Sequence, residues 1–202
     1  MVSAGRGCHL ILSIDSSHGT SAAVFSNDCL SFVSFDDPFG HAESIGLAIE
    51  KALSEAQVSV EQLTSVAVGR GPAPYTGLRV GMAAATALSK ARSLPLLGVI
   101  TLDAIAYAAG EKDLLVVTDA KRKELFAATY KAGKRLQGPM LLTVNALGSY
   151  PGFDLIEQRC NAKLIGSYAQ MALQSGIDLN ELSALYLRSP DVTPSAGKKV
   201  SG

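Results

Sequence analysis

The sequence predicts an α/β protein in which mixed β-sheets are covered by helices. Two observations support this fold class. Between residues 65 and 110, buried β-type segments alternate with segments of helical periodicity, and one strand–turn–strand unit occurs twice in the chain. Of the 202 residues, 48% are hydrophobic, which is enough for a large core.

The repeated unit is a β-hairpin. HLILSID, residues 9–15, is followed by the turn residues SSHG and a return segment, TSAAVF, and CLSFVSF extends the meander. The segment DLLVVTDAKRKELFAATY, residues 113–130, repeats the pattern of a buried strand, an aspartate, a polar turn and a return strand. Asp15 and Asp119 hold the same place in the two hairpins, which indicates an internal duplication.

Helices are expected where the apolar period changes. From His41 to residue 56 apolar residues recur at helical spacing, and further helices are predicted at 76–92, at 102–110 and at 167–175, with strands at 65–69 and 94–100. Glycine and proline break much of the remaining second half into short pieces. We therefore expect a first lobe over residues 8–110, a smaller second lobe over 111–190 and a disordered polar tail over 191–202.

The glycine-rich segment GRGPAPYTGLRVG, residues 69–81, could bind phosphate or allow close packing. A Walker loop needs a lysine after its last glycine, but Leu78 follows Gly77, and Pro74 replaces the third glycine of a dinucleotide fingerprint. A helix N-terminus that binds an anion remains an alternative. The packing interpretation explains more residues, because small residues recur every four positions at Gly77, Gly81, Ala85 and Ser89.

A second stripe of small residues, Ala83, Ala87 and Ala91, makes the same predicted helix apolar nearly all round. A helix of this kind is buried on two sides, and a sheet covers only one of them. The uncovered side predicts a subunit interface shared with the 41–56 helix, while burial of both faces within the monomer remains the alternative. The predicted partner-binding residues are His41, Glu43, Ile45, Leu78, Arg79, Gly81, Met82, Ala85, Leu88 and Ser89.

Charge, cysteine content and hydropathy argue against a polyanion-binding, a zinc- or disulfide-stabilised, and a membrane protein. The chain has eighteen basic and eighteen acidic residues, so its formal net charge is zero. The net charge therefore gives no reason to expect binding to a polyanion such as a nucleic acid. The basic turn at residues 121–123 is interpreted as a solvated hairpin tip, with contact to nucleic-acid phosphates as the alternative. Cys8, Cys29 and Cys160 form neither a zinc motif nor a disulfide framework. No signal peptide or membrane span is recognisable, so we expect a cytoplasmic protein.

Five segments together resemble the TsaB (YeaZ) family, the small subunit of the bacterial machinery that makes threonylcarbamoyladenosine in tRNA. They are ILSIDSSHGTSAAVF, HAESIGLAIEKAL, GRGPAPYTGLRVGMAAATAL, TDAKRKELFAATY and LYLRSPD, in the family's order and over nearly the whole chain up to Asp191. Ala42 replaces a usual serine, and Ala73 and Pro74 stand where glycine and serine are usual. The signature loop is therefore stiffer here.

The resemblance implies an actin-like ATPase-domain (ASKHA) superfold with a reduced second lobe. It also implies a non-catalytic subunit that pairs with TsaD, the threonylcarbamoyltransferase, and is joined by the ATPase TsaE, with tRNA contacted mainly through the complex. A stand-alone kinase or glycoprotease and a self-associating regulatory homodimer remain alternatives. The first would use this chain's own site, whereas the second would pair the small-residue helix with itself.

The resemblance also bears on cofactors. TsaD binds metal through an HxxxH pair, but Thr101 and Ile105 stand at the corresponding positions, so we expect no metal site and no catalytic residue. Asp15, Ser16 and Ser17 are the weak candidates for nucleotide binding, and the alternative is that the aspartates accept hydrogen bonds from their own turns. No cofactor is expected in the isolated chain, while ATP or an adenylate at the complex interface stays open.

Overall fold

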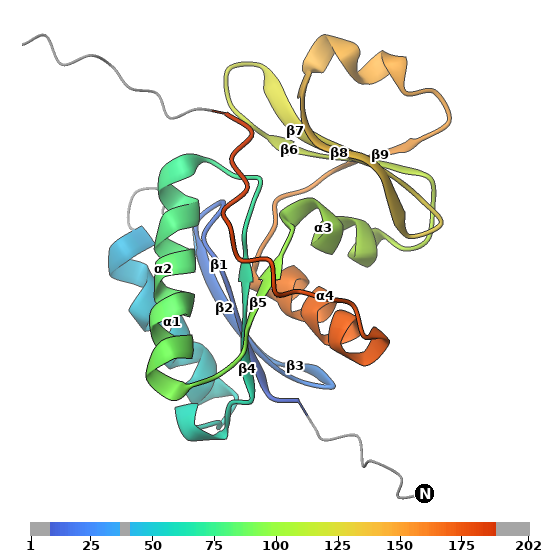
Figure 1. Cartoon of the computed structure of the whole chain (residues 1–202). Helices are drawn as coiled ribbons and strands as arrows, with labels where there is room; N and C mark the ends of the chain where they lie inside the picture. Colours follow the sequence, from blue (N-terminus) through green and yellow to red (C-terminus); the bar gives the residue numbers. More distant parts are fainter. Residues whose placement is uncertain (1–8, 37–40, 189–202) are drawn as a thin grey trace, which may run out of the picture.

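The computed structural model describes residues 9–36 and 41–188, except for the side chains of His41 and Tyr75 (Figure 1). The predicted tail at 191–202 therefore lies outside the described residues. The elements are β1 (Ile11–Asp15), β2 (Thr20–Ser26), β3 (Asp28–Phe35), α1 (His41–Glu55), η1 (Val60–Gln62), β4 (Ser65–Gly69), α2 (Tyr75–Arg92), β5 (Leu96–Val99), α3 (Thr101–Ala109), β6 (Leu114–Asp119), β7 (Glu124–Lys131), β8 (Lys134–Thr143), η2 (Val144–Ser149), β9 (Asp154–Glu157) and α4 (Ala162–Ser175).

Two mixed sheets repeat one topology. The first has the strand order β3-β2-β1-β4-β5 and the second β8-β7-β6-β9. In each, a three-stranded antiparallel meander is followed by a strand that pairs in parallel with the first strand of the meander, β4 with β1 and β9 with β6. The predicted α/β class with duplicated hairpins is confirmed.

The second copy is smaller, as expected. In the first copy the 15-residue helix α1 lies between the meander and the parallel strand, whereas in the second copy the short 3-10 helix η2 occupies that place in the chain. The parallel strand β4 is followed by α2 and then β5, whereas β9 is followed only by α4 in the chain up to residue 188. The second sheet consequently has four strands and the first has five.

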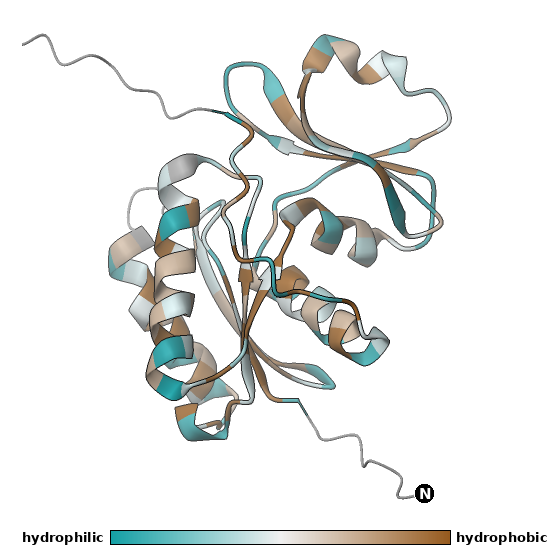
Figure 2. Ribbon diagram, viewed as in Figure 1, coloured by the Kyte–Doolittle hydropathy of each residue, from teal (hydrophilic) through white to brown (hydrophobic). Residues whose placement is uncertain are grey.

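Three clusters of buried apolar side chains hold the described elements together. Figure 2 shows where hydrophobic residues lie along the strands and helices. Helices α1 and α2 pack on one face of the first sheet through residues such as Ile14, Val68 and Ala48. The other face of that sheet packs with α3, α4 and the inner face of the second sheet in one continuous core that includes Ile105 and Ile165. A small cluster on the outer face of the second sheet contacts η2 and the segment after it. Within the described residues, no helix has both the length and the apolarity to cross a membrane.

Helix α4 follows the second sheet in the chain but covers the first. Its residues Ile165 and Ala169 lie in the core with β1, β2 and β5, and Gly166 allows the ring of Phe25 to approach the helix backbone. The helix begins at Ala162, five residues before the predicted start, because the side chain of Asn161 caps it by accepting a hydrogen bond from the Leu164 N–H.

Candidate functional site: the α1–α2 face and the turns between the lobes

The small-residue stripe of α2 serves packing within the chain. The hydroxyl of Ser16, at the end of β1, donates to the Gly77 carbonyl at 2.6 Å and accepts from the Gly81 N–H at 2.8 Å. It therefore stands between two groups that an α-helix would normally join to each other. A side chain at residue 81 would overlap Ser16. The packing interpretation of the glycine-rich segment explains this geometry.

Burial divides the ten predicted partner-binding residues. Ile45, Leu78, Gly81, Ala85 and Ser89 are buried against the chain's own sheet and turns. As a correction to the sequence prediction, these five are buried in the monomer's interior. Gly81 contacts Ser16 at the end of β1, and Ala85 packs in the core with the first sheet. Glu43 and Arg79 are exposed, Met82 and Leu88 are partly buried, and the side chain of His41 is outside the described part.

A different set of small residues forms the outer face of α1 and α2. Both helices lie on the same side of the first sheet (Figure 1), and Ala42, Gly46, Ala83 and Ala87 are exposed on them. A Cβ atom added at Gly46 would meet nothing within 4 Å. Leu47 is also exposed, at 43%. The two helices thus present a surface of short side chains that another helix could approach closely.

The predicted nucleotide-binding residues are engaged in their own turn. The Asp15 carboxylate accepts from the Ser17 N–H at 3.1 Å and from the Ser17 hydroxyl at 2.6 Å. Ser16 is committed to α2, as described above. Asp119 repeats this role in the second hairpin, where it accepts from the Lys121 N–H at 2.7 Å and from its ammonium at 2.8 Å. The alternative in which both aspartates stabilise turns therefore describes the observed contacts.

His18 lies in the first of these turns and faces the second lobe. Burial is the main effect that lowers the pKa of its imidazole below 6.5, and the nearby charges of Arg159 and Lys121 lower it further, while Asp119 opposes them. The backbone of Asp119 also acts to raise this pKa, but burial outweighs it. The neutral imidazole is thus the form that the folded protein favours.

This arrangement predicts how stability depends on pH. Because the pKa is lowered on folding, His18 contributes stability that is fully present above pH 6.5, the value of an unperturbed histidine, and that is lost as the pH falls through the folded-state value. We expect His18→Gln to flatten the pH dependence of the free energy of unfolding below about pH 6.5 in urea titrations. His9→Gln, at an exposed histidine, is the control for the loss of one imidazole. Equal slopes for wild type and His18→Gln would contradict the prediction.

The positions that correspond to the metal-binding pair of TsaD lie in the core. Thr101 and Ile105 are both fully buried at the start of α3. Across residues 9–36 and 41–188, no group of three or more histidine, cysteine, aspartate or glutamate side chains could hold a metal ion. The side chains of Thr101 and Ile105 pack in the interior of the protein.

The segment after α4 forms a strap between the lobes. The Leu185 N–H donates to the Arg70 carbonyl at 2.8 Å, and the Tyr186 hydroxyl accepts from Arg79 Nε at 3.1 Å. Arg188 donates to the carbonyl of Ala120 at 3.1 Å and forms an ion pair with Glu124. The strap thus connects the loop before α2, the first turn of α2 and the tip of the second hairpin (Figure 1).

A polar cluster that the sequence did not reveal also joins the lobes. Asp103 of α3 accepts from the Tyr130 hydroxyl at 2.7 Å and, through both oxygens, from Arg135 at 3.0 Å. Burial raises the pKa of Asp103, although these two partners act in the opposite direction. The three residues are far apart in the chain and share no motif, so only the folded backbone brings them together.

The fold and its turns define an α/β protein with two lobes of repeated sheet topology, of which the second is smaller. Residues 39–190 match the family model of TsaD, described as tRNA N6-adenosine threonylcarbamoyltransferase. The TsaB protein of Buchnera aphidicola from Schizaphis graminum, named as a tRNA threonylcarbamoyladenosine biosynthesis protein, is 30% identical over 92% of this chain and 91% of its own length. This chain belongs to the TsaB (YeaZ) family.

Two further comparisons concern the fold and a bacterial relative. YeaZ from Pseudomonas aeruginosa has the same fold, with a TM-score of 0.72 at 20% identity, over 89% of this chain and all of that one. An uncharacterized Mycobacterium leprae protein is 36% identical over 78% of this chain. The match covers 47% of that relative, so this chain spans about half of its length.

Proposed function

We propose that this chain is a non-catalytic subunit in the synthesis of threonylcarbamoyladenosine in tRNA. It binds TsaD through the outer face of α1 and α2 and supports the transfer of the threonylcarbamoyl group to the adenosine next to the anticodon. Membership of the TsaB family carries this proposal, and the exposed small residues of the two helices support it. TsaE would join this pair, and we expect the assembly to be cytoplasmic.

An accessory role agrees with the chemistry of the chain's own residues. Asp15, Ser16 and Ser17 use their polar atoms on the turn and on α2. Thr101 and Ile105 provide no imidazole where TsaD has its metal ligands, and both are buried. We infer that the chain binds no cofactor alone, and that ATP or an adenylate would meet it only at the interface with its partner.

Association with purified TsaD of the same organism tests the proposal. Ala83→Arg places a long charged side chain on the outer face of α2, and we expect at least about a tenfold loss of affinity in calorimetric titrations. Gln174→Arg is the matched control, because residue 174 is exposed on α4, which covers the opposite face of the first sheet. Circular dichroism checks that both variants are folded.

The outcomes separate the alternatives. If wild type does not bind TsaD, or if Ala83→Arg binds as well as Gln174→Arg, the proposed interface is wrong. A homodimer of the isolated chain that Ala83→Arg dissociates, without any binding of TsaD, would favour the self-associating alternative. Hydrolysis of ATP or peptide by the purified chain would favour the stand-alone enzyme.

A further inference from the structure

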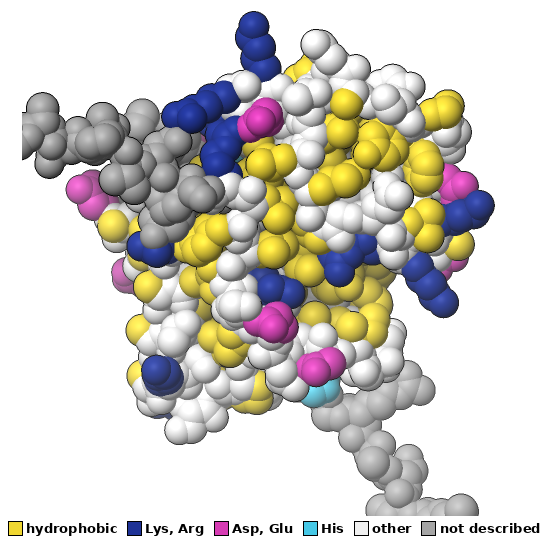
Figure 3. Space-filling model, turned by 45° about the horizontal axis from the view of Figure 1, so that its top comes forward, with side chains coloured by type: hydrophobic (Ala, Val, Ile, Leu, Met, Phe, Trp, Pro, Cys, Tyr) yellow, Lys and Arg dark blue, Asp and Glu magenta, His cyan; other side chains and the backbone are white. Residues whose placement is uncertain are grey.

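Positive charge gathers where the second hairpin meets the strap, although the whole chain has equal numbers of basic and acidic residues. Five cationic side chains, which we call the basic edge, belong to this region: Lys121, Arg122, Lys123, Arg159 and Arg188. Arg188 bonds the carbonyl of Ala120, and both Arg159 and Lys121 act electrostatically on His18. Figure 3 shows a group of Lys and Arg side chains at the upper left of this face with an acidic side chain beside it, and further basic side chains scattered over the rest of the face.

The turn that carries three of these residues has an unusual backbone. Lys121, Arg122 and Lys123 have φ values of 64°, 55° and 62°, in the left-handed region that glycine and asparagine adopt most easily. The carboxylate of Asp119 and the N–H of Val144, which donates to the Lys123 carbonyl at 3.3 Å, hold the turn in place. Glycine would form this turn at lower cost, so the presence of three long cations is better explained by their charge.

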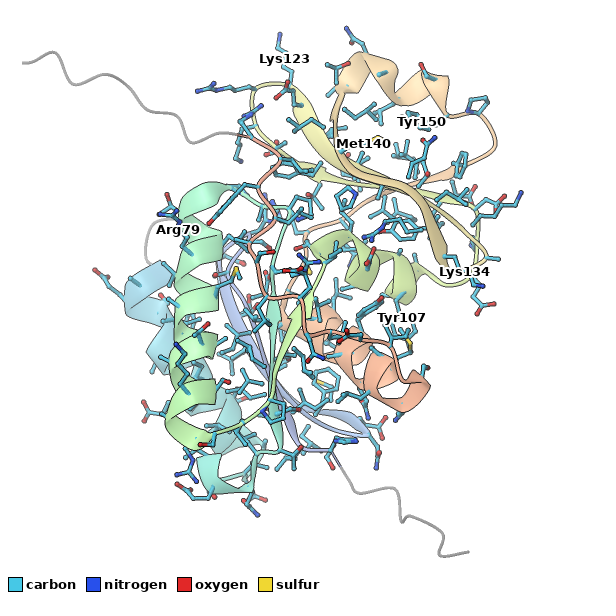
Figure 4. The ribbon with its side chains drawn as sticks, viewed as in Figure 1. Arg79, Tyr107, Lys123, Lys134, Met140 and Tyr150 are labelled. Carbon is cyan, nitrogen blue, oxygen red and sulfur yellow. The ribbon has the colours of Figure 1, made fainter. Side chains whose placement is uncertain are left out.

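Two of the five cations of the basic edge form ion pairs within the chain. The Lys121 ammonium contacts Asp119, and Arg188 pairs with Glu124. Within the described part of the chain, neither Lys123 nor Arg159 forms a salt bridge, and both are exposed. The side chain of Lys123 extends from the tip of the hairpin into solvent (Figure 4). A rigid turn thus presents cations outward at a fixed position.

We propose that the basic edge contacts backbone phosphates of the tRNA substrate and so helps to orient it on the complex. The inference rests on the proposed function, which brings a polyanion to this protein. Lysine and arginine side chains spaced along a turn match the regular charge of a nucleic-acid backbone and read no bases. The contact therefore adds affinity and sensitivity to salt, whereas selection of the adenosine stays with TsaD.

A matched control lies in the same sheet. Lys134 is exposed at the start of β8, and Figure 4 shows Lys123 and Lys134 at opposite ends of the second sheet. Both Lys123→Glu and Lys134→Glu change the net charge by the same amount. A third variant replaces all of residues 121–123 by glycine, which fits their φ values and removes the cations without strain.

The experiment measures binding of tRNA by the complex of this chain with TsaD, using fluorescence anisotropy at several salt concentrations. We expect Lys123→Glu to weaken binding about fivefold and to reduce the slope of log affinity against log salt by about 1. Lys134→Glu should match wild type, and the triple glycine variant should lose more of the slope than Lys123→Glu. Formation of the complex is measured separately for each variant.

These measurements distinguish the two proposals. If the complex forms and all variants bind tRNA as wild type does, the basic edge has no role in RNA binding, while the subunit proposal stands. An equal loss for Lys123→Glu and Lys134→Glu would show an effect of net charge alone and would also overturn the inference. A complex that does not form, or that binds no tRNA, would contradict the proposed function as well.

Discussion

Replacing Ala85 by arginine is expected to destabilise the folded protein by more than about 4 kcal/mol. Ala85 is 0% exposed and lies in the core between α2 and the first sheet, where a guanidinium would have neither water nor a carboxylate partner. The same substitution at Ala87, two positions along the helix and exposed, is expected to change stability by less than about 0.5 kcal/mol.

Urea denaturation followed by circular dichroism measures both variants. A folded Ala85→Arg variant with near wild-type stability would mean that α2 is not seated as described. Comparing Ala85→Arg with Ala87→Arg also separates unfolding from loss of the TsaD interface. Loss of partner binding by a variant at residue 85 would report unfolding, whereas loss at residue 83 or 87 reports contact with a partner.

A methyl group at Gly166 should have the next largest effect. Its Cβ would overlap the ring of Phe25 and the hydroxyl of Ser13, so α4 would have to move away from the first sheet. We expect Gly166→Ala to cost about 1–3 kcal/mol, because overpacking in a dense core forces side chains and backbone to shift. Such a loss would show that α4, which follows the second sheet in the chain, is an integral part of the first lobe's core.

Gly46→Ala is the control for this prediction. Gly46 is also helical, but a Cβ there would meet nothing within 4 Å. Alanine should therefore stabilise the helix by about 0.5–1 kcal/mol by reducing the freedom of the unfolded chain. Thermal and urea unfolding of the two variants should move in opposite directions, and a stabilised Gly166→Ala variant would contradict the packing of α4.

The periodicity of small residues along α2 predicted that another segment approaches the helix closely, but not which segment. The four-residue spacing of Gly77, Gly81 and Ala85 correctly predicted a close backbone approach along α2. It could not reveal which neighbour approaches, because a small stripe suits an internal turn and a partner helix equally well. The folded structure shows that the neighbour is internal, because the hydroxyl of Ser16 lies between the Gly77 carbonyl and the Gly81 N–H.

The sequence pattern did not predict strand β8, the start of α4 or the contact of Tyr186 with Arg79. The strand β8 lies at an edge and is largely exposed, so its pattern lacks the alternation that identifies a half-buried strand. The early start of α4 depends on the cap at Asn161, which lies outside the apolar period. Tyr186 lies in the segment LYLRSPD, and its contact with Arg79 joins residues 107 positions apart in the chain.

By itself, the sequence determined the α/β class, the duplicated hairpin, the smaller second half and the TsaB family, because periodicity, turn residues and motif order are local properties of the chain. The tertiary structure decided which face of each helix is free, that α4 returns to the first sheet, and that Asp103, Tyr130 and Arg135 meet. These depend on contacts between distant segments, whose energies come from mutual burial and charge and cannot be assigned until both partners are placed.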